Sequence, residues 1–203
     1  MVELAREVLR ANRRRARRLG YAGVPDDLPP PPPGRLRSAG EVVDRALAAH
    51  VIVSVAFGLD ARAAARWLQG LALDRSLTDD ESEYLGDTAD GIRLADAARR
   101  LQREALAVLL WTVGLAPPPD WEDAAPASAF AALPEPGHAP GVEFDDVLLR
   151  DPLQLASERD LAACMAWALG DDELSVGFAP GSVEPFVVWE RRRALEWVAG
   201  EPW

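Results

Sequence analysis

Two segments with helical spacing carry charged side chains inside their apolar faces. They cover residues 103–111 and 190–197. In the second segment, Arg191 follows Val187 by one helical turn, so on a helix it cannot lie wholly on the solvated side. A guanidinium in that position requires a carboxylate partner. We therefore expect Arg191 to be buried and to pair with Glu104 on the other segment, which would force the two helices to lie side by side.

Other charged residues at helical positions extend this pair into a candidate polar network. Its members are Glu41, Arg45, Glu104, Glu190 and Arg191. Glu41 is the second choice as the partner of Arg191. Burial raises the pKa of a carboxyl group, so Glu41, Glu81, Glu104 and Glu190 are candidates for an acid with a raised pKa, and the arginines are candidates to bind an anionic substrate. The pattern fits a structural network and the floor of a site equally well.

Helix signals dominate the chain, so the predicted fold class is all-α. Ser38 with Glu41 and Thr78 with Glu81 read as capping boxes, and Asp151 precedes a proline suited to the first helical position. Apolar spacing then predicts about seven helices. The expected ranges are 2–19, 38–57, 61–73, 79–85, 92–113, 152–169 and 185–199.

The length of 203 residues suggests a single α-helical domain, a helical bundle covering residues 1–203. Residues 1–20 form an arginine-rich N-terminal helix. Residues 24–34 hold six prolines, including Pro29–Pro33, and are expected to be a polyproline spacer. Residues 115–146 form a long loop rich in proline, alanine and acidic residues, with one helical turn near Phe130.

Charge is unevenly distributed along the chain. Residues 1–20 carry seven arginines and two glutamates, a net charge of +5, while the whole chain carries −11, so the remainder carries −16. An acidic body repels phosphate and attracts a basic partner. The basic run from Arg13 to Arg18 has the composition of a nucleic-acid contact, yet the same arginines can dock on the acidic remainder, so nucleic-acid binding is not favoured.

The loop from residue 117 to residue 146 has the composition of a partner-binding surface. It holds seven acidic residues and no arginine, and it carries Trp121 and Phe130. Aromatic side chains contribute much of the contact energy in protein interfaces, and charges set approach rate and specificity. The candidate partner-binding residues are Trp121, Glu122, Asp123, Phe130, Asp145 and Asp146.

Several chemistries are excluded or disfavoured. All 22 basic residues are arginine, so Schiff-base chemistry and a P-loop lysine are ruled out. The single Cys164 lies in an apolar run typical of a core thiol, and His50 with Ser54 lacks a nucleophile elbow. The two histidines, far apart in sequence, give no metal-ligand spacing. We predict no catalytic set, metal or cofactor.

Targeting signals are not evident either. The first 19 residues lack the apolar stretch of a secretory signal and become arginine-rich instead. The longest apolar stretch, residues 46–58, is too short to cross a bilayer. We expect a cytoplasmic protein that does not enter the membrane.

The tryptophans on the predicted helices are expected to pack in the core. They are Trp67, Trp111, Trp167, Trp189 and Trp197.

A set of short patterns runs along nearly the whole chain. They are Arg37-Ser38 with Glu41 and Arg45, Leu77-Thr78 with Glu81 and Leu85, Arg103-Glu104-Ala105 leading to Leu110-Trp111 and Gly114, and Glu190 to Trp197. In combination they resemble a bacterial family catalogued only as domain of unknown function 4272. The resemblance implies a mostly helical bacterial protein and supplies no activity.

Three functions fit these observations. The leading hypothesis is a non-enzymatic protein-binding module, for example an immunity or escort protein for a basic partner. The second is an enzyme or small-anion binder that uses the buried glutamates and arginines. The third is association with nucleic acid through the N-terminal arginine helix. A concave pocket lined by Glu104 and Arg191 would favour the second, and a filled core with an acidic face would favour the first. The sequence does not indicate the oligomeric state.

Overall fold

The computed structural model describes residues 4–86, 94–141, 144–170, 181 and 183–203, and every regular element in these ranges is a helix. The predicted all-α fold class is confirmed. The α-helices are α1 (Arg6–Arg18), α2 (Ala39–Ala56), α3 (Ala61–Gly70), α4 (Asp79–Gly86), α5 (Leu94–Leu101), α6 (Arg103–Thr112), α7 (Pro152–Leu169) and α8 (Pro185–Val198). Two short 3-10 helices are η1 (Asp74–Ser76) and η2 (Ala127–Phe130).

The predicted capping residues start their helices. The Ser38 hydroxyl accepts a hydrogen bond from the Glu41 N–H at 3.2 Å, and the Glu41 carboxylate accepts one from the Ser38 N–H at 2.8 Å. Thr78 and Glu81 exchange the same two bonds at the start of α4. The Asp151 carboxylate accepts from the Leu153 N–H. Both capping boxes are therefore confirmed.

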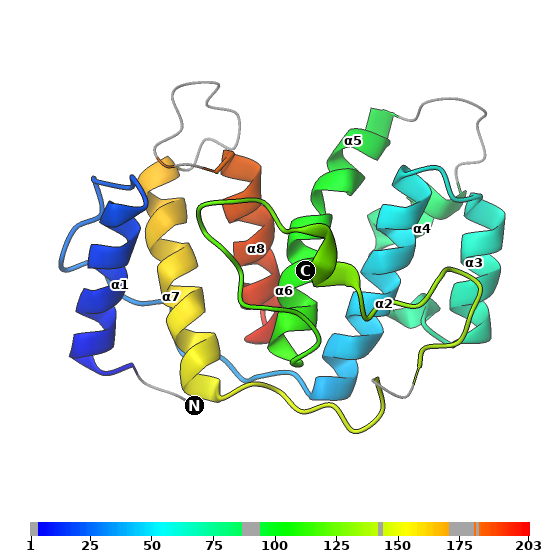
Figure 1. The fold of residues 1–203 in the computed structure, drawn as a ribbon, viewed down its shortest axis with the longest axis horizontal. Coiled ribbons are helices and arrows are strands. Elements are labelled where there is room, and N and C mark those ends of the chain that lie inside the picture. Colours follow the sequence, from blue (N-terminus) through cyan, green and yellow to red (C-terminus); the bar gives the residue numbers. More distant parts are fainter. Residues whose placement is uncertain (1–3, 87–93, 142–143, 171–180, 182) are drawn as a thin grey trace.

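The helices form a row in which each packs on the next (Figure 1). α1 packs on α7, α7 on α8, α8 on α6, and α6 on α2, while α3 packs against the far side of α2 and α5 contacts α2, α6 and α8. Helices α2 and α6 form the middle of the row and are buried almost all round. Val42, Ile52, Val108 and Leu109 are each completely inaccessible to solvent. This matches the continuous apolar sequence of the two helices.

The predicted helix 92–113 is divided, so the described residues hold eight α-helices. The break lies at Gln102, whose backbone N–H bonds to the carbonyl of Arg99, three residues back, at 3.1 Å. This 3-10 bond tightens the chain and changes its direction between α5 and α6. Gln102 is neither glycine nor proline, so no breaker residue marks the position.

One of the tryptophans expected in the core lies largely in solvent. Trp67 and Trp111 are buried, and Trp189 and Trp197 are half-buried against the core. Trp167, near the end of α7, is 50% exposed, so its prediction is wrong. Helix α7 makes its main helix contacts with α1 and α8, and the described residues leave half of the Trp167 side chain accessible to solvent.

Candidate functional site

The Arg191–Glu104 pair joins α8 to α6 as predicted. The Arg191 Nη2 and Nε atoms donate to Glu104 Oε2 at 2.8 and 3.1 Å. Each side chain is only 1% exposed. The second-choice partner, Glu41, lies instead at the exposed start of α2. A charge pair this deep is expensive to desolvate unless further hydrogen bonds complete it.

Those further bonds go to the backbone of residues 120–125. Both Glu104 carboxylate oxygens accept from the Ala125 N–H at 3.1 Å. Arg191 donates to the carbonyl of Asp123 at 2.9 Å and to the carbonyl of Asp120. The ion pair therefore fixes one part of the long acidic loop onto the bundle. It lies in a filled core, and no described cavity is lined by Glu104 and Arg191.

Trp121 is part of the same arrangement, which corrects the expectation that the loop presents this side chain to a partner. It is 1% exposed, its Nε1 donates to Glu158 at 2.8 Å, and the Arg191 guanidinium lies 5.3 Å from its ring centroid. Phe130, in η2, is half-buried against the core. The residues on either side of Trp121 are acidic, so nothing in the local sequence indicates that its indole is buried.

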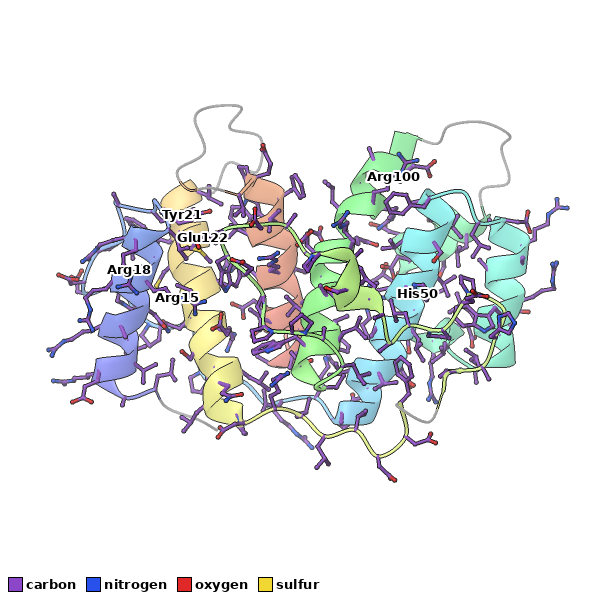
Figure 2. The ribbon with its side chains drawn as sticks, viewed as in Figure 1. Arg15, Arg18, Tyr21, His50, Arg100 and Glu122 are labelled. Carbon is purple, nitrogen blue, oxygen red and sulfur yellow. The ribbon has the colours of Figure 1, made fainter. Side chains whose placement is uncertain are left out.

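The acidic candidates of the loop are exposed but are held by different helices. Glu122 and Asp123 belong to the stretch whose backbone is bonded to Glu104 on α6 and Arg191 on α8. Figure 2 labels Glu122 in this stretch. Residues 134–138 cover α2 and α3, because His50 bonds to the Pro134 carbonyl and the Trp67 Nε1 donates to the His138 carbonyl. The chain then returns through the exposed Asp145 and Asp146 to α7. The two acidic pairs thus lie on separately anchored parts of the loop.

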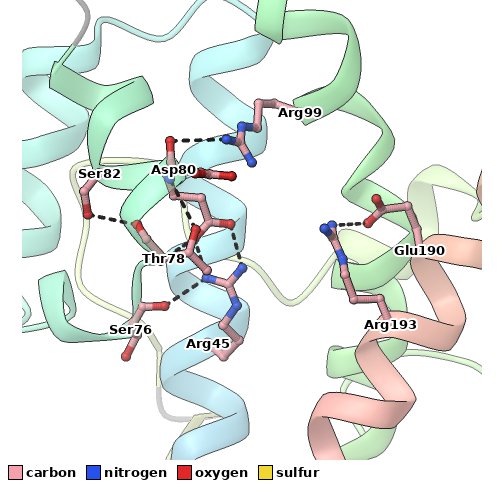
Figure 3. A network of polar contacts seen from close by, with 9 residues as sticks. Arg45, Ser76, Thr78, Asp80, Ser82, Arg99, Glu190 and Arg193 are labelled. Carbon is pink, nitrogen blue, oxygen red and sulfur yellow. Dashed lines mark hydrogen bonds and ion pairs between the residues drawn. The ribbon is translucent and has the colours of Figure 1, made fainter. Parts of the chain in front are cut away.

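A second buried pair links α2 to α4 (Figure 3). The guanidinium of Arg45 donates to both oxygens of Glu81 at 2.7 and 2.6 Å, and also to the Ser76 carbonyl at 2.9 Å. Burial alone would raise the pKa of Glu81, but the hydrogen bonds and charge of Arg45, with the Thr78 N–H, lower it. The expectation of a raised pKa is wrong here.

The pKa of Glu41 is also lowered, where a raised pKa was expected. The hydrogen bonds from the Ser38 backbone and hydroxyl are the largest cause of this lowered pKa. Glu190, in contrast, has a raised pKa, because burial outweighs the charge of Arg193, whose Nη2 lies 2.5 Å away. Glu190 is thus the candidate whose environment matches the prediction.

Glu190 and Arg193 line an open cavity of about 460 Å³ over α8. Its other described lining residues are Phe186, Trp189, Arg192 and Glu196. Trp203 connects this region to the Arg45 pair, since the guanidinium carbons of Arg45 and Arg193 lie 3.8 and 4.9 Å from its ring centroid. Of the five predicted network residues, only Glu104 and Arg191 pair with each other. Arg45 pairs with Glu81, Glu190 with Arg193, and Glu41 with Arg37.

A third buried ion pair is not predicted from the sequence. Arg13 on α1 donates to Asp160 Oδ2 on α7 at 2.8 Å, and both side chains are 1% exposed. Asn12 donates to the same oxygen at 2.9 Å. The signal was the spacing of Leu9 and Ala16, which places Arg13 between them on one face of the helix.

The basic patch of α1 is partly occupied by such contacts. Arg15 pairs with Glu158 at 2.8 Å, and Arg17 pairs with Asp26 at 2.7 Å. Arg14 and Arg18 are exposed and have no ion-pair partner among the described residues (Figure 2). The patch therefore docks on the protein through three of its arginines.

Two other side chains that could carry chemistry, Cys164 and His50, are buried and half-buried in the fold. Burial and the nearby Asp160 raise the pKa of the Cys164 thiol to about 11. Burial lowers the pKa of His50, which the Pro134 hydrogen bond only partly offsets. In the described part of the chain, no three His, Cys, Asp or Glu side chains gather as a metal site would need. None of the helices described there combines the length and apolar character needed to cross a membrane.

Comparison with known families adds one positive result. The model of the family described as Domain of unknown function (DUF4272) matches residues 10–203. The chain belongs to this family. The match runs from within α1 past the end of α8 and includes all three buried ion pairs. No curated protein and no solved structure matches the chain.

Proposed function

We propose that this DUF4272 protein is a non-enzymatic cytoplasmic binding protein for a basic protein partner, in the manner of an immunity or escort protein. We define its docking surface, the acidic loop face, as Asp120, Glu122 and Asp123. The supporting observation is that a buried ion pair holds this stretch by its backbone while all three carboxylates stay exposed.

The face stays acidic because Arg191 bonds to the backbone of this stretch and leaves the aspartate carboxylates free of it. Arg191 contacts the main-chain carbonyls of Asp120 and Asp123, and its charge is matched by Glu104. No arginine among the described residues pairs with the three carboxylates of the face. Their charge therefore remains unneutralised, on a chain whose net charge is −11. Such a surface accelerates encounter with a basic partner.

The fixed backbone also favours binding. A flexible loop must be ordered when a partner docks, which costs conformational entropy. Here the Ala125 N–H and the two aspartate carbonyls are already bonded to the core. Trp121 packs underneath and donates to Glu158. The acidic loop face is thus presented in one conformation before any partner arrives.

The test compares two double variants that change net charge equally. Glu122→Gln with Asp123→Asn neutralises the acidic loop face. Asp74→Asn with Glu83→Gln neutralises two exposed acids on η1 and α4. Partners captured by the wild-type chain from its own cells are identified by mass spectrometry, purified, and titrated against each variant at several salt concentrations.

We expect a basic partner whose affinity falls at least tenfold with the loop variant and changes little with the control, and whose binding weakens as salt rises. Equal affinity for the two variants would remove the acidic loop face from the proposal. A captured partner with an acidic surface, insensitive to salt, would contradict the proposed class of partner.

A further inference from the structure

A second surface feature is a mainly apolar groove of about 740 Å³. Its walls are the start of α1, the proline segment of residues 30–36, the start of α7 and the end of α8. The buried Leu155, Leu195 and Val198 contribute to its floor. Its size lies within the range of sites that hold small organic ligands.

The proline segment keeps the groove open. Pro29–Pro33 form an unbroken run whose rings restrict the backbone. The segment is also tied down along its length. Arg159 donates to the Pro32 carbonyl at 2.7 Å, and the Arg37 N–H donates to the Val198 carbonyl at 3.0 Å. Between these ties, Gly34 lies so close to the Ala199 carbonyl that a Cβ there would collide with it. The wall cannot readily move inward to fill the apolar space.

The charged residues that line this groove in the described part of the chain are arginines: Arg6, Arg35 and Arg159. Arg159 is matched by Glu196 and the Pro32 carbonyl. Arg6 and Arg35 are exposed, line the groove, and have no ion-pair partner in the described ranges. Glu41 is within electrostatic reach of Arg35, but its contacts are with Ser38 and Arg37. No acidic residue appears among the described lining residues, although the chain as a whole is strongly acidic.

We infer that this groove binds a free long-chain carboxylate, with its hydrocarbon tail along the apolar floor and its carboxylate at Arg6 and Arg35. A preformed apolar trough suits an unbranched tail, because removing that tail from water is favourable. Guanidinium groups form charge-assisted hydrogen bonds with carboxylates. This ligand site is independent of the acidic loop face, and neither proposal depends on the other.

The experiment is calorimetric titration of the full chain with dodecanoate, octanoate and dodecyltrimethylammonium. Dodecanoate should bind, and octanoate should bind at least tenfold more weakly because four methylenes are missing. The cationic amphiphile has the same tail and should bind at least tenfold more weakly than dodecanoate. Similar affinity for the two head groups would overturn the inference, and so would the absence of dodecanoate binding.

Two pairs of arginine variants locate the site. Arg6→Gln with Arg35→Gln should weaken dodecanoate binding at least tenfold, since charged hydrogen bonds are lost. Arg14→Gln with Arg18→Gln removes two exposed charges elsewhere on α1 and should leave it unchanged. Equal effects of the two pairs would contradict the assignment.

A filling variant separates the groove from general surface adsorption. Ala156→Phe places a ring into the groove from α7 and should abolish binding, while a thermal melt by circular dichroism confirms that the variant is folded. Undiminished binding by the folded variant would contradict the assignment of the ligand site to this groove.

The last experiment measures binding of the chain to vesicles of anionic phospholipid. Binding to vesicles without binding to monomeric dodecanoate would assign the groove to a membrane surface and reject the free carboxylate.

Discussion

Arg191 on α8 and Glu104 on α6 lie 87 positions apart in sequence and meet through two hydrogen bonds at 2.8 and 3.1 Å, with both side chains 1% exposed. The pair joins two helices of the core and at the same time bonds to the backbone of residues 120–125. Its loss should therefore affect both the stability of the bundle and the conformation of the acidic loop face.

The first prediction is that Arg191→Met destabilises the chain by roughly 3–5 kcal/mol, because Glu104 is left as a buried charge without its partner. Urea unfolding followed by circular dichroism gives the free energy. Arg192→Met is the matched control, since Arg192 is 38% exposed and lies 3.8 Å from Glu196. Removing that exposed pair should cost less than about 1 kcal/mol. Equal costs for the two variants would mean that the buried pair adds nothing specific.

The second prediction concerns the pair that joins α1 to α7. Asp160→Asn leaves the buried Arg13 guanidinium without a countercharge and should cost roughly 3–5 kcal/mol. Arg14→Gln changes an exposed neighbour of Arg13 and should have an effect within about 0.5 kcal/mol. Chemical unfolding of both variants tests this. An Asp160→Asn variant as stable as the wild-type chain would show that α1 docks by its apolar contacts alone.

Local signals in the sequence are sufficient for the capped starts of α2, α4 and α7 and for one ion pair. Ser38 and Thr78 carry their capping glutamates three residues later, so both boxes are readable within four residues. Arg191 was found because its own helix has apolar residues on both sides of it. Its partner Glu104 followed because the two segments shared the same unusual pattern.

The features that were missed depend on contacts between distant segments. Arg13 lies in a run of arginines that resembles a solvated face, and only the packing of α1 on α7 shows that it meets Asp160. Trp121 lies in an acidic loop, and its burial requires Arg191 and Glu158 from two other helices. The break at Gln102 involves no helix-breaking residue. The partner of Arg13 and the burial of Trp121 depend on tertiary contacts, which the periodicity of one segment does not contain.

The third prediction uses the lowered pKa of Glu81. A carboxyl whose pKa is lower in the folded chain than its ordinary value near 4.5 contributes stability above that value and loses it as pH falls through the folded pKa. Glu81→Gln removes this contribution. The variant should therefore melt well below the wild-type chain at pH 7, and the difference should shrink as pH falls below about 4. A difference in melting temperature that is constant from pH 7 to pH 3 would contradict the lowered pKa.

The last prediction is that Glu190→Gln shows the opposite dependence on pH. Burial raises the pKa of Glu190 in the folded chain, so the folded state holds this proton more tightly than the unfolded state does. The associated stability is present below the ordinary value near 4.5 and is lost as pH rises through the folded pKa. Glutamine cannot ionise, so the melting temperature of Glu190→Gln relative to the wild-type chain should increase between pH 4 and pH 7. The relative melting temperature of Glu81→Gln should change in the opposite sense, and at pH values below about 4.5. Melting curves of both variants from pH 3 to pH 7 therefore test the two directions together. Parallel pH profiles for the two variants would show that the Arg45 contacts of Glu81 and the burial of Glu190 do not shift the two pKa values in opposite directions.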